Sequence, residues 1–503
     1  MYDVIIIGAG VIGSSIAREL SRYKLETLVI EKEKDVCEVT SMANSGIIHS
    51  GYDPKEGTLK AKLNLIGNQN IVRLREELGF EYKNIGSLTV AFEENDLETL
   101  KQLQQRGFNN NVNTKILNHD EVLALEPNLN KNVKYALLAE TCGIVNPFEY
   151  TVALMENAMD NGVKLHLEEE VVNILNNKNH YVVLTNKGKY EARIVVNAAG
   201  LMSGKIAKMI GTDIEIKPRK GEYLVINHLP KAYINHTIFP LPTEKGKGVL
   251  MTPTTSFNYL VGPTSEFVPE DDDFVTDTST LDSIKEKVSK MLDNIPFNET
   301  IRSFAGLRAV GPTGDFIIEE DKNNKNFYHL AGIDSPGLAS SYGIAAYLVD
   351  LIKENNNFTL NPNFNPYRRP FVHLNSLSID DKNNYFKKDP KYGHIICRCE
   401  KVSEAEIIDT IHRNCGARTV RGVKKRVRPG FGKCQGGFCE SLVVNILARE
   451  LNVDEKEVCY GREHSEILKY DSKEDHNENI WFDSNWWWFC WYGKCFRGIW
   501  QWN

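Results

Sequence analysis

Three glycines near the N-terminus have the spacing of a turn that holds a phosphate. Gly8, Gly10 and Gly13 form a G-x-G-x-x-G pattern. It lies between an apolar run at residues 2–7 and a helical pattern that reaches about residue 23. Such glycines permit a tight turn and the close approach of backbone to a pyrophosphate at a helix N-terminus. Glu31 ends a second apolar run, where a carboxylate accepts hydrogen bonds from a ribose. The pattern predicts a dinucleotide site in a βαβ unit.

Four of the ten cysteines fall in two tight pairs near the C-terminus. Cys397 and Cys399 form C-x-C, and after 34 intervening residues Cys434 and Cys439 form C-x4-C. Paired thiolates suit a metal centre, because a thiolate is a strong ligand for zinc and for iron–sulfur clusters. Zinc ribbons usually space each pair by two residues, so the C-x-C spacing favours an iron–sulfur cluster.

His49 lies in a loop rich in glycine and serine and is a candidate base. Oxidation of an alcohol needs a group that takes the hydroxyl proton while hydride leaves the carbon. An imidazole that titrates near neutrality suits this task. From the residue alone, a polar side chain that satisfies the hydrogen bonds of its loop is an equally good interpretation.

The pattern of predicted helices and strands that must position these residues changes along the chain. Helical and strand patterns alternate to about residue 217, which is typical of a parallel sheet. Between about 218 and 302 the apolar runs alternate and are punctuated by turns, so we expect an antiparallel sheet. A strand at 327–331 and a helix beginning at Ser335-Pro336-Gly337 return the chain to the first domain, with serine as N-cap and proline at the first helical position.

The βαβ unit, the loop at 45–51, Asn197-Ala198-Ala199-Gly200 and Ser335-Pro336-Gly337-Leu338 resemble the D-amino-acid-oxidase-like flavoproteins. Within that group, residues 1–355 resemble the FAD-linked glycerol-3-phosphate oxidases and dehydrogenases. The resemblance implies FAD as the cofactor, which the glycine pattern alone does not separate from NAD. It implies that FAD is held by Gly8, Gly10, Gly13, Glu31, Ser45, Gly46, Val172, Ala199, Gly200, Gly332, Gly337 and Leu338.

The same resemblance implies roles for four residues around the substrate. A family histidine in the matching segment lies beside the flavin, which favours His49 as the catalytic base. Arg308 and Lys247 match family positions near the substrate, where fixed cations bind a phosphate. Ser335 matches a family serine at the start of the last helix, whose positive end would stabilise negative charge on reduced flavin. L-2-hydroxyglutarate oxidoreductases also resemble the His49 segment, so a hydroxy-carboxylate substrate stays open.

Residues 391–455 resemble the bacterioferritin-associated-ferredoxin-like [2Fe–2S] domain at the C-terminus of the anaerobic glycerol-3-phosphate dehydrogenase large subunit. This implies that Cys397, Cys399, Cys434 and Cys439 bind a [2Fe–2S] cluster. Flavin takes two electrons and a cluster passes them one at a time, so the pairing predicts a dehydrogenase that feeds a partner. We expect six basic residues between the cysteine pairs on a solvated face, where they also offset the cluster's charge: Arg418, Arg421, Lys424, Lys425, Arg426 and Arg428.

These patterns predict an α/β protein with a Rossmann-like FAD-binding domain, a discontinuous antiparallel-sheet substrate domain of the D-amino-acid-oxidase type, and a small α-rich [2Fe–2S] domain. The FAD-binding domain is expected at residues 1–82, 143–217 and 303–357, and the substrate domain at 83–142 and 218–302. Residues 358–390 are rich in Asn, Asp, Lys and Pro and are expected to be a linker to the [2Fe–2S] domain at 391–470.

Length, composition and charge exclude several classes. The 503 residues suggest roughly three domains, and 42% hydrophobic with 25% charged residues exclude a disordered chain. The net charge of −7 gives no global positive field, so no nucleic acid partner is expected. No apolar run is long enough for a transmembrane segment. The start without a cationic leader favours a cytoplasmic enzyme, and peripheral contact at the inner face of the cell membrane stays open.

All seven tryptophans lie in residues 481–503, within a tail at 471–503 of abruptly different composition. One interpretation is an interfacial membrane anchor, because tryptophan favours the headgroup region. We favour a frameshifted translation of a neighbouring gene. One nucleotide later, Trp486, Trp487, Trp488 and Trp491 all become glycine, and the shifted sequence G-G-G-[FS]-[AV]-G is another dinucleotide pattern. The neighbour would be a second flavin- or NAD-binding protein and a natural electron acceptor.

The combined prediction is an FAD-dependent dehydrogenase that oxidises sn-glycerol 3-phosphate to dihydroxyacetone phosphate. Its electrons pass through a [2Fe–2S] cluster to a partner protein. The first alternative is a dehydrogenase of L-2-hydroxyglutarate or another 2-hydroxy acid. The second alternative is a redox sensor or assembly scaffold that binds FAD and the cluster without efficient turnover.

Overall fold

The structure, a computed structural model, describes residues 1–242, 248–471, 488–491 and 494–497, with side chains to residue 468. The chain divides into two compact units. The first is Met1–Lys32 with Val36–Pro370, and the second is Glu33–Asp35 with Phe371–Asn503. No helix among the described residues is both long enough and apolar enough to cross a bilayer.

An eight-stranded sheet in the first unit carries the glycine turn. Its order is β10-β11-β12-β1-β2-β9, with β20 on β12 and β19 on β20. Parallel pairing joins β9, β2, β1, β12 and β20, as the alternating pattern predicts. The strands are β1 (Tyr2–Ile7), β2 (Thr27–Ile30), β9 (Lys164–His166), β10 (Val171–Asn176), β11 (Tyr181–Thr185), β12 (Lys189–Asn197), β19 (Ile317–Glu320) and β20 (Phe327–Ala331).

A nine-stranded sheet forms the other half of the first unit. Its order is β17-β13-β16-β15-β14-β5-β7-β6, with β18 on β13. The pairs are antiparallel as expected, except that β5 and β14 are parallel. The strands are β5 (Ser87–Ala91), β6 (Lys115–Asn118), β7 (Tyr135–Ala139), β13 (Lys217–Ile226), β14 (Thr237–Pro240), β15 (Leu250–Pro253), β16 (Tyr259–Gly262), β17 (Glu266–Phe267) and β18 (Thr300–Val310).

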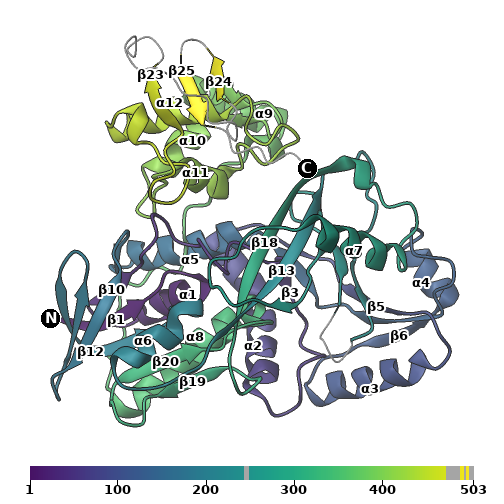
Figure 1. Cartoon of the computed structure of the whole chain (residues 1–503), viewed down its shortest axis with the longest axis horizontal. Helices are drawn as coiled ribbons and strands as arrows, with labels where there is room; N and C mark the ends of the chain where they lie inside the picture. Colours follow the sequence, from purple (N-terminus) through teal and green to yellow (C-terminus); the bar gives the residue numbers. More distant parts are fainter. Residues whose placement is uncertain (243–247, 472–487, 492–493, 498–503) are drawn as a thin grey trace. The chain divides into compact units, whose positions relative to one another are not determined.

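β13 and β18 are long neighbouring strands, which Figure 1 shows side by side. Their antiparallel ladder runs from the pair Lys217 and Val310 to the pair Ile226 and Thr300. Residues 303–310 therefore belong to the nine-stranded sheet, although the sequence placed them in the FAD-binding domain. Apolar runs alone do not say which of two sheets a strand joins, because pairing is decided by residues far away along the chain.

Helices pack against both large sheets of the first unit, which also contains a small third sheet. Helices α1, α2, α5 and α8 pack against one another beside the eight-stranded sheet. The small sheet contains β3 (Ile47–Ile48), β8 (Gly143–Val145) and β4 (Tyr82–Asn84). The helices of the first unit are α1 (Val11–Leu20), α2 (Leu59–Leu78), α3 (Asp96–Asn109), α4 (His119–Leu125), α5 (Pro147–Asp160), α6 (Ser203–Met209), α7 (Thr278–Ser289) and α8 (Gly337–Asn355).

Helix α8 starts later than the sequence suggests. Its first residue is Gly337, and Pro336 occupies the N-cap position without a side-chain hydrogen bond. The prediction of Ser335 as N-cap and Pro336 as first helical residue is wrong. The reason is local: the carbonyl of Asp334 accepts a hydrogen bond from the Gly337 N–H at 2.6 Å, so a backbone group satisfies the first helical donor.

The second unit is built on three packed helices, α10 (Glu404–Ile411), α11 (Val420–Val427) and α12 (Glu440–Leu451). A short hairpin, β21 (Ile395–Cys397) and β22 (Val402–Ser403), precedes them. Strands β23 (Leu468–Asp471), β25 (Lys494–Arg497) and β24 (Trp488–Trp491) form a three-stranded sheet. Most of the tail at 471–503 lies outside the described residues.

The predicted linker at 358–390 is not a linker throughout. The boundary between the units falls after Pro370, and α9 (Ile379–Lys388) lies in the second unit. This helix buries no residue, so its hydrophobic pattern gave no signal. It is held by its ends: the Ser378 hydroxyl accepts from the Asp381 N–H at 3.1 Å, with acidic residues in the first turn and basic residues in the last.

Candidate active site and cysteine centre

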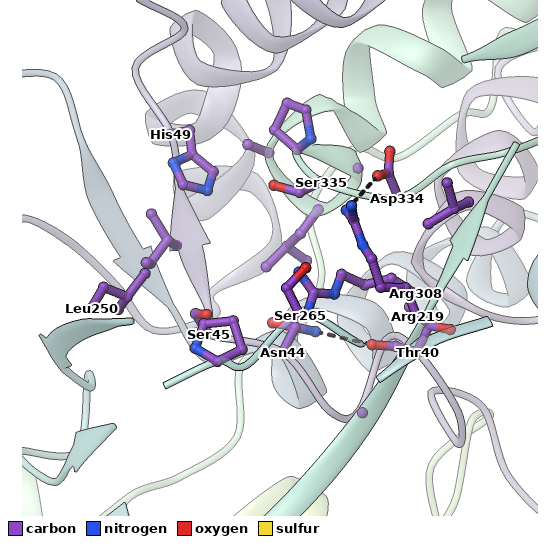
Figure 2. A pocket seen from close by; sticks show the side chains of 18 of the residues that line it. Thr40, Asn44, Ser45, His49, Arg219, Leu250, Ser265, Arg308, Asp334 and Ser335 are labelled. Atoms are coloured by element: carbon purple, nitrogen blue, oxygen red, sulfur yellow. Dashed lines mark hydrogen bonds and ion pairs between the residues drawn. The ribbon is translucent and has the colours of Figure 1, made fainter. Parts of the chain in front are cut away.

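A cavity of about 1150 Å³ lies in the first unit. Its wall includes the glycine turn at the start of α1, the loop around His49, the facing strands β13 and β18, and the segment that opens α8. Such a volume exceeds the upper end of about 1,000 Å³ for ordinary small-molecule pockets. Figure 2 shows side chains from the His49 loop, from β13 and β18 and from the segment before α8 around one space.

The glycine turn has the backbone geometry that a bound dinucleotide requires. Gly8 has a φ of +105°, and a Cβ there would lie 2.6 Å from the carbonyl oxygen of Ala198. A Cβ on Gly13 would lie 1.9 Å from the carbonyl oxygen of Gly8. The Glu31 carboxylate accepts a hydrogen bond from the Ala9 N–H at 2.7 Å, which places it beside the turn. These residues therefore fit an adenosine pyrophosphate at the N-terminus of α1.

The structure brings most of the predicted cofactor residues to the cavity and leaves a few elsewhere. Gly8, Gly13 and Glu31 form the turn behind the wall, and Ala199 lies between two lining residues. Val172 is on β10 with 53% of its surface exposed and does not line the cavity. The predicted residues that line the cavity are Gly10, Ser45, Gly46, Gly200, Gly332, Gly337 and Leu338.

His49 follows β3 and borders the cavity. Its backbone carbonyl accepts hydrogen bonds from the side-chain amides of Asn64 at 2.7 Å and Asn68 at 3.2 Å. Its ring lies 5.8 Å from the ring of Phe239, measured between centroids. The backbone is thus anchored to α2 while the imidazole faces the cavity, as Figure 2 shows.

Arg308 lies on β18 in the same wall. Its guanidinium donates to the carbonyls of Lys220 and Thr264, and no carboxylate of the described residues pairs with it. A Cβ on Gly221 would lie 2.7 Å from Nη2 of Arg308, so this glycine makes room for the guanidinium. Burial lowers the pKa of Arg308 below its ordinary value, yet an arginine stays charged at neutral pH.

The other two predicted substrate residues have different outcomes. Ser335 lines the cavity at an exposed position, two residues before α8. Lys247 lies outside the described residues, so its role stays a prediction.

The structure adds charged residues that the sequence did not single out. Asp334 receives the Lys60 ammonium at 2.6 Å and Nη2 of Arg219 at 3.2 Å, and all three line the cavity. The Tyr223 hydroxyl lies 3.2 Å from Oγ of Ser45, and burial raises the pKa of Tyr223. Asp334 was detectable as the neighbour of Ser335. Lys60 and Arg219 were not, because each comes from a different, distant element.

The four paired cysteines converge in the second unit. Cys399 and Cys434 have their sulfurs 3.6 Å apart, and a hydrogen bond joins Cys397 to Cys439. The hydrogen bond from Cys439 lowers the pKa of Cys397, and a thiolate is the form that ligates a metal. Two pairs of thiols match a two-iron cluster held by four cysteines. No three His, Cys, Asp or Glu side chains among the described residues are arranged around a single ion.

Three of the six basic residues between the cysteine pairs are buried, although the sequence suggested a solvated face for all of them, and Arg418 is exposed as expected. Lys424, Lys425 and Arg426 lie on α11 and are 5%, 1% and 1% exposed. Asp35, which belongs to this unit, receives both nitrogens of the Arg426 fork at 2.7 and 2.9 Å and the Lys425 ammonium at 3.0 Å. The carboxylate that makes their burial tolerable lies 391 positions away, beyond any sequence pattern.

Family comparisons match both units. The FAD dependent oxidoreductase family matches residues 3–351, and the BFD-like [2Fe-2S] binding domain matches residues 395–449. A glycerol 3-phosphate dehydrogenase of Caloramator mitchellensis is 46% identical over 478 residues, which cover 94% of this chain and 100% of that relative. A glycerol 3-phosphate oxidase of Mycoplasma genitalium is 35% identical over 376 residues, covering 72% and 98%.

A solved structure agrees with the fold of the first unit. The dithionite-reduced L-alpha-glycerophosphate oxidase of Mycoplasma pneumoniae with FAD bound has a TM-score of 0.71 and 33% identity to this chain. The similarity covers 74% of this chain and 99% of that structure.

Proposed function

This chain belongs to the FAD dependent oxidoreductase family, and on that premise we propose that it oxidises sn-glycerol 3-phosphate to dihydroxyacetone phosphate. The expected fold class, the FAD cofactor and the [2Fe–2S] domain are confirmed by the family matches. Two findings support glycerol 3-phosphate as the substrate. Two of the relatives are glycerol 3-phosphate enzymes, and His49 and Arg308 border the same cavity as the glycine turn.

The reaction removes a hydride from the carbon of the secondary alcohol and a proton from its oxygen. Bound FAD supplies the acceptor for the two electrons of the hydride. His49 takes the proton, because its side chain faces the cavity and an imidazole is the side chain type best suited to general base catalysis. Asn64 and Asn68 hold the backbone of this residue, so the ring position is set by α2.

Arg308 binds the phosphate of the substrate. Its guanidinium is held by backbone carbonyls, which fix its direction without neutralising its charge. A guanidinium in this state offers charge-assisted hydrogen bonds to a phosphate. Ser335 adds a hydroxyl on the cavity wall, before the N-terminus of α8.

Anaerobic mixing of the purified, flavin-loaded protein with glycerol 3-phosphate tests this function. We expect bleaching of the flavin absorbance and formation of dihydroxyacetone phosphate. Bleaching by L-2-hydroxyglutarate alone would assign Arg308 to a carboxylate and replace the proposed substrate. Absence of bleaching with either compound would favour the sensor or scaffold and overturn the proposal.

The electrons leave through the second unit to a redox protein with an acidic surface, such as a second flavin- or NAD-binding protein. Several features of the cysteine centre support this. Cys399 is exposed, and Phe438, next to Cys439, is 76% exposed. Arg398 and Lys401 flank Cys399, are exposed and have no ion-pair partner among the described residues. Electron-transfer partners bind through small interfaces, and complementary charge increases their rate of association.

A charge-reversed variant, R398E with K401E, tests the exit surface. We expect flavin bleaching by substrate to be unchanged and reduction of an acidic acceptor such as a flavodoxin to slow and lose its salt dependence. The double variant K387E/K388E, on exposed positions of α9, is the matched control. Equal slowing in both variants would refute the assignment of this surface. Sequencing the codons of residues 471–503 tests whether the acceptor is encoded in the shifted frame.

A further inference from the structure

Two arginines face each other across neighbouring strands in the cavity wall. In the ladder between β13 and β18, Arg219 is directly opposite Arg308. Opposite residues on an antiparallel pair have Cβ atoms about 4.5–5.5 Å apart, and like charges placed there destabilise the sheet. Both arginines line the cavity. The fold therefore maintains an unfavourable pair at the place where a ligand enters.

The carboxylates nearby do not neutralise this pair. Asp334 is the one carboxylate of the described residues within ion-pair distance of Arg219, and it is shared with Lys60. Within the part of the chain that the structure describes, the acceptors of Arg308 are backbone carbonyls. Lys60, Arg219 and Arg308 thus carry three positive charges, and Asp334 is the carboxylate that ion-pairs with Lys60 and Arg219. Asp315 also lines the cavity, where its carboxylate accepts from the backbone N–H groups of Leu59 and Lys60. The excess of cations around the two arginines suits an anionic ligand.

The hydrogen bonds point the same way. The Nε of Arg219 is buried and has no hydrogen-bond acceptor among the described residues. A buried donor without an acceptor is costly, and it becomes favourable when a ligand oxygen accepts from it. Burial and the charge of Arg219 both lower the pKa of Arg308, whereas Tyr223 and Asp334 oppose this shift.

We propose that Arg219 is a second anion-binding residue, and that Arg219 and Arg308 together bind the phosphate dianion of the substrate. This inference rests on the proposed function and extends it to a residue that no comparison assigns. A phosphate ester carries about two negative charges at neutral pH and three acceptor oxygens, enough to receive both guanidinium groups. Asp334, in the loop before α8, pairs with Arg219, as Figure 2 shows, and its negative charge opposes that of a bound phosphate.

The test compares R219Q and R308Q with R302Q in the flavin-loaded protein. Arg302 is on the same strand β18, exposed, and outside the cavity, so it controls for loss of an arginine from that strand. The readouts are the Kd of inorganic phosphate, from the change in flavin absorbance, and the KM and kcat for glycerol 3-phosphate. We expect R219Q and R308Q each to weaken phosphate binding and raise KM by roughly 10- to 150-fold, with R302Q unchanged.

The double variant R219Q/R308Q separates a shared ligand from two independent effects. If both arginines bind one phosphate, the loss in the double variant is smaller than the product of the single losses. Should R219Q fail to retain flavin, R219K keeps the charge but not the fork, and it is expected to bind phosphate more weakly than the wild type.

The outcomes distinguish this inference from the proposed function. Phosphate binding and turnover of R219Q equal to those of R302Q, with R308Q impaired, would overturn the role of Arg219 and leave the function standing. No binding of phosphate and no flavin bleaching by glycerol 3-phosphate in the wild-type protein would instead overturn the function itself.

Discussion

The cavity wall of the first unit and the interior of the second unit each place two cations on one carboxylate. In the cavity, Lys60 and Arg219 share Asp334, with side chains 17%, 23% and 8% exposed. In the second unit, Lys425 and Arg426 share Asp35, and these side chains are at most 2% exposed. The two clusters contain nearly the same chemical groups, but solvent reaches the side chains of the cavity cluster and hardly reaches those of the Asp35 cluster.

This difference separates a binding function from a structural one. A charge that borders a cavity can exchange a water or a carboxylate for a ligand, so an excess of cations is useful there. A charge closed off from water has no such alternative, and its stability depends on the partner built into the fold. Changes at the cavity should therefore alter kinetics and affinity, whereas changes at Asp35 should alter stability.

The largest expected kinetic effect is at the cavity, in H49Q. Loss of the base should slow flavin reduction by glycerol 3-phosphate by about 10²- to 10⁴-fold, because general base catalysis contributes that much. Stopped-flow bleaching measures the rate, and inorganic phosphate affinity and thermal stability should stay unchanged. His228→Gln, at an exposed position outside the cavity, is the control. A rate equal to the control would remove His49 from the chemistry.

The largest expected effect on stability is at the closed site, in D35N. Removing this charge leaves Lys425 and Arg426 buried without their carboxylate, and we expect the second unit to lose about 3–5 kcal/mol. Urea unfolding followed by the cluster absorbance measures this, and flavin reduction should remain normal. D380N, on the exposed face of α9, should change nothing. A free energy of unfolding in D35N equal to that of the wild type would contradict a structural role for Asp35.

Acid should act on the same carboxylate. Burial alone would raise the pKa of Asp35, but Arg426 and Lys425 outweigh it and hold the pKa far below its ordinary value. Because the folded pKa is the lower one, this stabilisation is complete above about pH 4 and declines as pH falls below that value. Unfolding curves between about pH 6 and pH 3 should show this loss in the wild type and not in D35N. Parallel curves for the two proteins would refute it.

The smallest expected effect is that of D334N, and it is a gain in affinity for phosphate. Removing this carboxylate takes a negative charge away from the anion site, so inorganic phosphate should bind more tightly, by roughly 2- to 5-fold. Titration of the flavin absorbance measures this, with D282N on the exposed side of α7 as the control. Weaker binding in D334N would mean that aiming Arg219 matters more than the repulsion.

Local sequence patterns predicted the strands and the glycine turn beside the cavity well. Strands β1 and β20 have the predicted bounds, and the glycines of the turn are where a side chain would collide with backbone. Such features depend on residues close in sequence: an apolar run, a glycine with positive φ, a helix start. The cysteine spacing was informative for the same reason, since each pair is only a few residues long.

The sequence by itself determined the cofactor turn, the paired thiols and the loop that carries His49, because short-range spacing encodes them. Only the tertiary structure decided that Arg219 faces Arg308, that Asp334 binds Lys60 and Arg219, and that Asp35 receives the basic residues of α11. The physical reason is that a charge is tolerated or made reactive by the groups around it. Those groups come from distant parts of the chain and meet only when the strands pair and the helices pack.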